Sequence, residues 1–457
     1  MTTNLSYVSC PLPDDLRRLI DYGDTERARR LIERRIGEPA LPECMKDRLR
    51  FELLILDRLP LDYPLTEEEA YQQLREEIRG FTREEMEELR DDGIMAWAYR
   101  DGKVYYHEDA VDSVYESCPQ FNERRVHQEA VERSRRSAER LDTMIRRLKA
   151  GEEVAARFRL RTELTIKAEP GREGKKVRVH MPIPVDGTQS VPEQILLMPP
   201  GYLAPPTHPQ RTAYFEGEYR PGMTFVTDVQ YTTRAKYVEP RPEAVLGEQP
   251  AFDTEELLPQ ISFTPFIRQL TAELAGDEKN PLLAARRFYD YVTTRTRYRY
   301  VSPYFMYDCI PEFFGAGQRG DCGMYSLLFI TLCRCWGIPA QWQSGFYTRP
   351  DHAGMHDWAR FYIAPYGWLF ADGSFGAAAY ETGHLDRWNF YFGNLEPWRL
   401  VCNSAIQQEL DPPRTFLRYD PYDSQAGEVE FEDRPARRFE YTSSRKILSY
   451  EETWTRG

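Results

Sequence analysis

Residues 320–340 read GDCGMYSLLFITLCRCWGIPA, and this stretch carries the strongest structural signal in the sequence. Gly320 permits a tight turn, and the apolar run around Leu327 predicts a buried helix. Gly337, followed by Pro339, is a typical signal for the end of that helix. Cys322 is therefore expected at or just before the first helical turn.

A cysteine at a helix start suits chemistry better than packing. Backbone N–H groups at that end favour a thiolate and lower the pKa of a thiol. A buried structural role is the ordinary alternative for any cysteine, and we adopt it for Cys333 and Cys335, which are two residues apart and do not face each other as metal ligands would. Gly-Asp-Cys-Gly is poor core sequence, so Cys322 is the candidate nucleophile.

A thiolate nucleophile needs a histidine nearby and a third group that orients the histidine. Residues 356–376 read HDWARFYIAPYGWLFADGSFG, which predicts two antiparallel strands joined at Pro365-Tyr366-Gly367. Pairing across that turn brings Asp372 roughly opposite His356 and Asp357. A solvated hairpin with polar ends is the alternative. Together with Cys322, the pattern predicts a Cys322, His356 and Asp372 triad.

Four motifs in order carry a family resemblance: Gly-Asp-Cys-Gly, Leu-Cys-Arg-Cys-Trp-Gly-Ile-Pro-Ala, His-Asp-Trp and Gly-Trp-Leu-Phe-Ala-Asp. Over about residues 255–400 the chain resembles the transglutaminase-like superfamily, which has a papain-related fold. The resemblance implies Cys322 as nucleophile, His356 as base and Asp372 as orienting acid. Gly393 to Arg399 is similar to sequence that follows the catalytic core in bacterial members. Animal members use calcium, but no loop with calcium-ligand spacing is present, so calcium is not carried over.

Other residues near the motifs are candidates for binding the substrate or for stabilising the oxyanion. Tyr304 or Gln318 could supply an oxyanion donor beside the Cys322 backbone N–H. Trp358 is a candidate substrate contact, although a core aromatic is its more ordinary interpretation. Three polar residues are interpreted as exposed or as the rim of a cleft: His352, His384 and Asp386.

The whole chain is expected to be α+β and multidomain. Residues 1–152 predict a mainly helical domain, and Asp101-Gly102 within residues 95–109 predicts a hairpin that resembles a winged helix. Residues 153–250 alternate apolar and polar positions and predict a β-sandwich. Residues 251–457 are expected to form the transglutaminase-like catalytic domain with C-terminal strands.

Composition narrows the possible functions of the 457 residues. The formal net charge is -13, and residues 65–109 hold 14 acidic and 6 basic residues, so the winged-helix pattern is read as a packing module without nucleic-acid partners. No apolar run is long enough to span a membrane, and the N-terminus MTTNLSYVSCPLPDD lacks the pattern of a signal peptide. Eight scattered cysteines favour thiols in a reducing cytoplasm over a disulfide framework.

These observations predict an enzyme that transfers acyl groups from amides through a cysteine, without metal or cofactor. Hydrolysis of a peptide, protein or small amide is favoured because water is the default acceptor. Two alternatives stay open: protein crosslinking by a transglutaminase, and a non-catalytic peptide-binding scaffold. The sequence indicates neither the substrate nor the oligomeric state.

Overall fold

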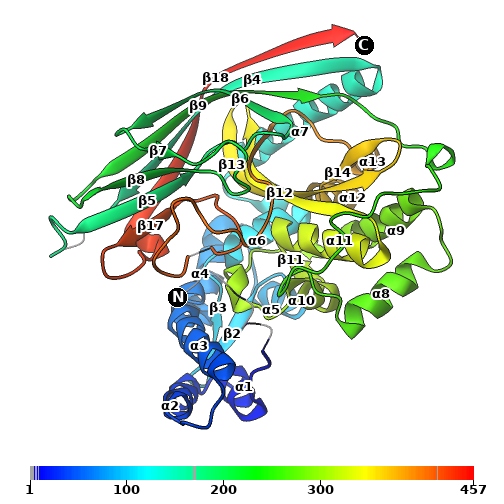
Figure 1. Cartoon of the computed structure of the whole chain (residues 1–457). Coiled ribbons are helices and arrows are strands. Elements are labelled where there is room, and N and C mark those ends of the chain that lie inside the picture. Colours follow the sequence, from blue (N-terminus) through cyan, green and yellow to red (C-terminus); the bar gives the residue numbers. More distant parts are fainter. Residues whose placement is uncertain (1–4, 6–7, 9, 168–170, 419, 457) are drawn as a thin grey trace.

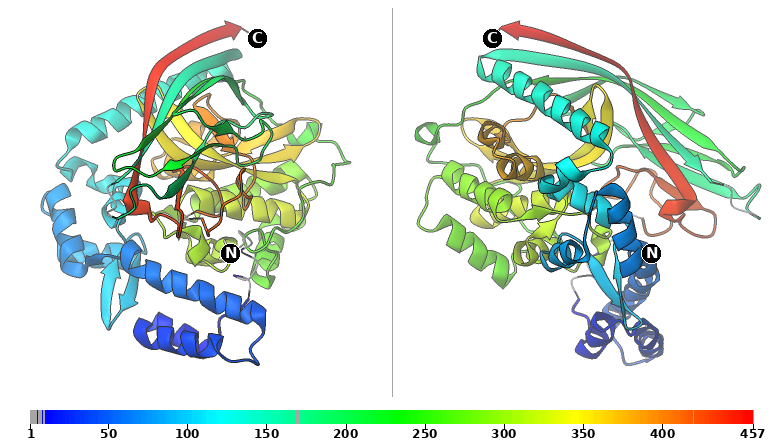
Figure 2. Two further views of the ribbon diagram at one scale, coloured as in Figure 1. Left: turned by 60° about the vertical axis from the view of Figure 1, so that its left-hand side comes forward. Right: turned by 180° about the vertical axis from the view of Figure 1, so that it is seen from behind.

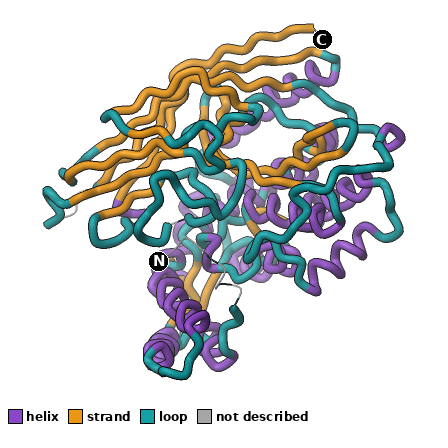
Figure 3. The backbone as a smooth tube through the Cα atoms, viewed as in Figure 1, coloured by secondary structure: helices purple, strands orange, loops and turns teal. Residues whose placement is uncertain are grey.

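The computed structural model describes residues 5, 8, 10–167, 171–418 and 420–456. Residues 1–4, 6, 7 and 9 of the N-terminal stretch, on which the signal-peptide prediction rests in part, lie outside the described residues. Figure 1 shows helices around the N-terminus, a mixed helix and sheet core in the middle, and long strands that gather at the C-terminus. Figure 3 shows the same division between the orange strands and the purple helices. No helix within the described residues is long and apolar enough to cross a membrane.

The N-terminal segment is helical, as the apolar spacing predicts. Its elements are α1 (Asp14–Asp21), α2 (Thr25–Ile36), α3 (Glu43–Asp62), β1 (Leu65–Thr66), α4 (Glu67–Glu77), α5 (Arg83–Asp91), β2 (Trp97–Arg100), β3 (Lys103–Tyr106), α6 (Ala110–Ser117), η2 (Pro119–Arg124) and α7 (Gln128–Lys149). The predicted hairpin is confirmed, because β2 pairs with β3 across Asp101 and Gly102, whose φ angles of 51° and 75° are both positive. β1 adds a third strand beside β3.

Helix α7 is buried along its C-terminal half only. Leu141, Met144, Ile145 and Leu148 are buried, but Val126 lies before the helix and is exposed. The reason is tertiary: only the C-terminal half of α7 packs against the first long strand of the sandwich, while its N-terminal half borders an open cavity. Figure 2 shows α7 running beside the sandwich.

The central segment forms two antiparallel sheets, which supports the predicted β-sandwich. Its own strands are β4 (Glu152–Ile166), β5 (Lys176–Pro182), β6 (Ser190–Met198), β7 (Tyr202–Leu203), β8 (Thr212–Glu218) and β9 (Thr224–Ala235). The two sheet orders are β17-β5-β8-β7 and β18-β4-β9-β6. β17 (Glu428–Phe431) and β18 (Tyr441–Arg456), which were expected to belong to the catalytic domain, therefore pair inside the sandwich.

The core sheet is five-stranded and has the order β15-β14-β13-β12-β16. Its elements and the helices around it are η3 (Pro242–Ala244), α8 (Pro265–Ala275), α9 (Pro281–Thr294), β10 (Arg297–Tyr298), η4 (Tyr304–Met306), α10 (Ile310–Gly317), β11 (Arg319–Gly320), α11 (Cys322–Trp336), β12 (Ala340–Arg349), β13 (His352–Ile363), β14 (Gly367–Ala371), α12 (Gly373–Glu381), α13 (Leu385–Phe390), β15 (Phe392–Gly393) and β16 (Arg399–Asn403), with η5 (Arg438–Glu440) just before β18. α11 packs on β13, where Phe329 meets Phe361 edge to face. The helix and both strands predicted from residues 320–376 are thus confirmed.

Candidate active site

The start of α11 is organised around Cys322. Asp321 caps the helix, because its carboxylate accepts a hydrogen bond from Met324 N at 3.2 Å. The Tyr304 hydroxyl donates to the same carboxylate. A Cβ on Gly323 would lie 1.9 Å from Tyr304 Oη, so only glycine fits between the helix and this tyrosine. Gly-Asp-Cys-Gly therefore fixes the cap, the cysteine and the close approach of Tyr304.

His356 and Asp372 form a buried pair. His356 Nε2 lies 2.8 Å from Asp372 Oδ2, and Phe375 stacks on the imidazole with ring centroids 4.2 Å apart. The strand register differs from the predicted one: Ala371 pairs with Ala359, which puts Asp372 level with Trp358 rather than with His356. The carboxylate reaches the imidazole along the diagonal because Asp372 follows the end of β14 and caps α12.

Arg399 completes this pair on its far side. Its guanidinium lies 2.8 Å from Asp372 Oδ2 and 2.7 Å from Glu396 Oε1, and all three side chains are buried. Burial by itself would raise the pKa of Asp372, but the charges of His356 and Arg399 lower it to about 2. Asp372 is therefore an ionised carboxylate held between His356 and Arg399.

The Cys322 thiol contacts a different residue from the one predicted. Its Sγ lies 3.3 Å from Asp357 Oδ2, and among the described residues no hydrogen bond joins it to His356. Asp357 and His356 are neighbours in a strand and point to opposite faces, so the face that meets Cys322 carries the carboxylate.

The expectation of a lowered thiol pKa is wrong for this arrangement. Burial raises the pKa of Cys322 well above its ordinary value, and the carboxylates of Asp357 and Asp321 raise it further. These two effects outweigh the favourable helix start, so the thiol is protonated in this arrangement.

A crossing segment, defined as residues 404–427 between β16 and β17, reaches over Asp357. Gln425 Nε2 donates to Asp357 Oδ1 at 2.5 Å and to the His356 carbonyl at 3.0 Å. Ser344 donates to Asp423, and Asn403 Nδ2 donates to Ser344 Oγ at 3.0 Å. A cavity of about 680 Å³ opens beside Gln425 and Asp423. The crossing segment thus fixes Asp357 next to the thiol.

The supporting candidates lie in different environments. Tyr304 is at the site, but its hydroxyl is engaged by Asp321. Gln318 is the left-handed C-cap of α10, with φ of 56°, and its carbonyl accepts from Arg297 N at 2.9 Å. Trp358 is fully buried and its indole donates to Gln343 Oε1 at 2.7 Å, which is a packing role.

The outlying polar candidates are not brought together with the thiol. His352 is exposed at the start of β13. His384 precedes α13 and lines a separate cavity. Asp386 is exposed and lies 3.2 Å from Lys149. Among the described residues no group of three or more histidine, cysteine, aspartate or glutamate side chains could hold a metal ion.

Sequence reasoning missed three contributors: Asp357 as the partner of the thiol, Arg399 as the partner of Asp372, and Gln425. Two of them carried a signal. Asp357 lies inside the His-Asp-Trp motif, and Arg399 ends the motif-like stretch that begins at Gly393. Gln425 lies 68 residues from Asp357 in a stretch without a motif, so nothing local indicated it.

Comparison with known proteins agrees with the motifs. A family model described as the transglutaminase-like superfamily matches residues 268–373. No curated protein matches the chain. One similar solved structure is a candidate cysteine protease from Cytophaga hutchinsonii, with 13% identity, 66% of this chain and 90% of that chain covered, and a TM-score of 0.39. Another is the periplasmic domain of TgpA from Pseudomonas aeruginosa, with 12% identity, 53% and 94% covered, and a TM-score of 0.27. By the match at residues 268–373, the chain contains a core of the transglutaminase-like superfamily.

Proposed function

We propose that the chain is a cysteine-dependent amide hydrolase with Cys322 as nucleophile, His356 as acid and base, and Asp372 as orienting group. The observation that carries the proposal is the buried contact of 2.8 Å between His356 Nε2 and Asp372 Oδ2, on the strand whose next residue touches the Cys322 thiol. A carboxylate that orients an imidazole supplies the base and the orienting acid that thiol acyl transfer needs, and here the cysteine contacts the residue next to that imidazole in the strand.

The first chemical step forms a thioester. Cys322 gives its proton to His356, and the sulfur attacks the carbonyl carbon of the amide. The C–N bond then breaks, and the departing nitrogen takes the proton from His356. This step requires the Cys322 thiol and the His356 imidazole to come together, because the present arrangement holds the thiol against Asp357 on the face opposite His356.

The second step releases the product. Water gives a proton to His356 and attacks the carbonyl carbon of the thioester. The C–S bond then breaks, and the departing sulfur takes the proton from His356, which yields a carboxylic acid and the free thiol. Asp372 stays ionised through both steps and stabilises the imidazolium, with Arg399 holding the carboxylate in place. Transfer to an amine would follow the same route with nitrogen in place of water.

The test uses an activated ester so that the natural substrate need not be known. p-Nitrophenyl acetate is mixed with the protein, quenched in acid and analysed by mass spectrometry. We expect one acetyl group on Cys322 that disappears with time, and none in Cys322→Ala. The reaction is repeated with millimolar methylamine as a competing acceptor. Release of the acetyl group as the acid rather than as the amide would favour hydrolysis over crosslinking. Acetylation at an equal rate in Cys322→Ala would reject the nucleophile.

One observation favours a second candidate, a non-catalytic scaffold. The thiol bonds to Asp357, and its raised pKa disfavours the thiolate that attack requires. For a scaffold, neither the wild-type protein nor a variant that frees the thiol, such as Asp357→Asn, would form an acyl-enzyme.

A further inference from the structure

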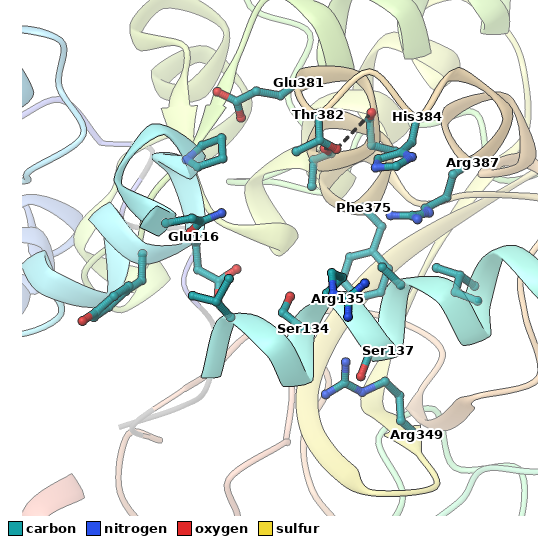
Figure 4. A pocket seen from close by; sticks show the side chains of 18 of the residues that line it. Glu116, Ser134, Arg135, Ser137, Arg349, Phe375, Glu381, Thr382, His384 and Arg387 are labelled. Carbon is teal, nitrogen blue, oxygen red and sulfur yellow. Dashed lines mark hydrogen bonds between the residues drawn. The ribbon is translucent and has the colours of Figure 1, made fainter. Parts of the chain in front are cut away.

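Two adjoining cavities lie on the side of the core that faces α7. The larger, of about 540 Å³, is bounded by α6, α7, α12 and the end of β12, and the smaller, of about 260 Å³, lies between α7 and the turn after β12. Arg349 and Ser137 line both cavities, so the two lie next to each other. Figure 4 shows Arg349 beside Ser137 at one side of the larger cavity, with Glu116 and Glu381 at the opposite side.

The smaller cavity gathers positive charge. Arg133, Arg136 and Arg140 lie on α7 at spacings of three and four residues, so their side chains share one helix face. Arg349 meets them from the end of β12, and all four line the cavity. Asp351 is the one carboxylate among the described lining residues. Although the chain has a net charge of -13, four guanidinium groups therefore surround this cavity of about 260 Å³.

These charges are poorly neutralised within the described part of the chain. Among the described residues no carboxylate lies within 4.0 Å of Arg133, Arg136 or Arg140, whereas Arg135 on another face of α7 binds both Glu132 and Glu139. Among the described residues Arg349 has one carboxylate within 4.0 Å, that of Asp351 at 3.8 Å, and it also interacts with the more distant charge of Glu116. Its Nε is buried without a hydrogen-bond partner in the described structure, which is an unfavourable state for a charged donor.

The positive charge around the smaller cavity also lowers the pKa of the neighbouring His352. The pKa of His352, which is exposed but partly shielded from water, is lowered by that shielding and further by the charges of Arg349, Arg445 and Arg133, while Asp351 opposes them. Like charges on adjacent helical turns repel modestly where they are exposed, as Arg133, Arg136 and Arg140 are, and an anion bound between them would relieve that repulsion. Guanidinium groups bind carboxylate and phosphate oxygens in pairs, which makes four of them around one cavity suited to a multivalent anion.

We propose that this cavity binds a small ligand with two or more anionic oxygen groups, phosphate or carboxylate. Arg136, Arg140 and Arg349 hold the charged groups, and Ser137 donates a further hydrogen bond. The remainder of the ligand extends into the larger cavity, past Arg349. The site contains none of the residues proposed for acyl transfer, so it does not rest on that function.

The position of the cavity links it to the core. Tyr347 and Phe375 line the larger cavity and also contact the His356 imidazole, with ring centroids 6.2 Å and 4.2 Å apart. A ligand that contacts Tyr347 and Phe375 from the cavity would therefore touch the same two rings that pack against His356. The test measures only the affinity for the anion, so its result does not depend on whether Cys322 is catalytically active.

The test is isothermal titration of the full chain with pyrophosphate and with citrate, at constant ionic strength. We expect saturable binding of one anion per chain, and weakening by at least tenfold in the double variant Arg136→Gln/Arg140→Gln and in Arg349→Gln. Arg146→Gln is the matched control, because Arg146 is an exposed arginine of the same helix outside both cavities. It is expected to bind within twofold of wild type.

The two probes distinguish the source of the charge: tighter pyrophosphate binding indicates a phosphate ligand, and tighter citrate binding a polycarboxylate. Equal weakening in Arg146→Gln would overturn the site, since it would mean unspecific attraction to α7. Binding of poly-glutamate without binding of either small anion would also overturn it, in favour of an acidic protein partner. Far-ultraviolet circular dichroism checks that each variant is folded, and Arg349→Gln tests the site independently of α7.

Discussion

At the scale of single residues, the candidate site divides into two pairs that occupy opposite faces of β13. His356 faces Asp372 and Arg399, and the neighbouring Asp357 faces the Cys322 thiol. The first pair is the one that we propose for acyl transfer, and the second holds the Cys322 thiol on the other face of the strand. The balance between them decides whether the thiol is available.

Replacing Asp357 by asparagine is expected to activate the thiol. Asparagine carries no negative charge against a thiolate, and its amide can donate a hydrogen bond to it, so the pKa of Cys322 should fall. A fall of one unit raises the thiolate fraction about tenfold at a fixed pH below the pKa. The measurement is the rate of iodoacetamide labelling of Cys322 across pH 6 to 10. Asp351→Asn, a change at the exposed turn between β12 and β13, should leave that rate unchanged; an unchanged rate in Asp357→Asn would mean that Asp357 does not control the thiol.

Asp372→Asn should keep the fold and lose most of the acyl transfer. The variant loses the carboxylate that stabilises an imidazolium, and losses of about 10²-fold or more are typical of an orienting group. Deacetylation after p-nitrophenyl acetate gives the rate, and thermal unfolding checks the fold. Asp386→Asn, at an exposed aspartate after the core, is the control. Equal rates in the two variants would assign Asp372 a structural role alone.

Much of this site could be predicted from residues 320–372 because its signals are local. The Asp321 cap, the cysteine at the helix start and the strand turn at Gly367 are each read within a few residues. The partner of the thiol could not be predicted, because it depends on which face of β13 meets α11. Gln425 depends on a chain crossing 68 residues away.

At the scale of elements, the start of α11 is determined by contact with η4. Gly323 is the residue that allows the contact, since any side chain there would collide with Tyr304. The sequence predicted the helix and its end at Gly337, whose φ is 102°. It did not predict that the second glycine of the motif serves packing, because the approach of Tyr304 comes from another element.

Gly323→Ala is therefore expected to destabilise the protein by about 1–3 kcal/mol, the usual cost of overpacking a filled site. The added Cβ would meet Tyr304 Oη at 1.9 Å. Gly317→Ala is the matched control, because Gly317 ends α10 and an added Cβ there would meet no atom within 4 Å, so the change should be neutral or slightly stabilising. Urea unfolding of both variants measures the difference. Equal stability of the two would show that Tyr304 moves aside freely.

At the scale of the whole molecule, the sandwich and the core are tied together by the crossing segment. The chain leaves the core sheet at β16, passes over Asp357 and enters the sandwich at β17. Asn403 at the end of β16 binds both Ser344 of β12 and the Ser424 carbonyl of the crossing segment. The polar groups beside the thiol are therefore supplied by three separate parts of the fold, which explains why no local pattern revealed them.

The buried acid of this crossing segment should make stability depend on pH. Burial, and then the charge of Asp357, raises the pKa of Asp423 to about 8, whereas an unfolded aspartate titrates near 3.9. The stabilising contribution of the bound proton is fully present below about pH 4 and is lost as the pH rises towards 8. Asp423→Asn carries no titrating group and can still accept the hydrogen bond from Ser344. The free energy of unfolding is measured in urea at pH 5, 6.5 and 8. As the pH rises, the value for the wild type should fall relative to the value for Asp423→Asn. Asp386→Asn should follow the wild type, and parallel pH profiles for wild type and Asp423→Asn would show that Asp423 is ionised in the folded protein.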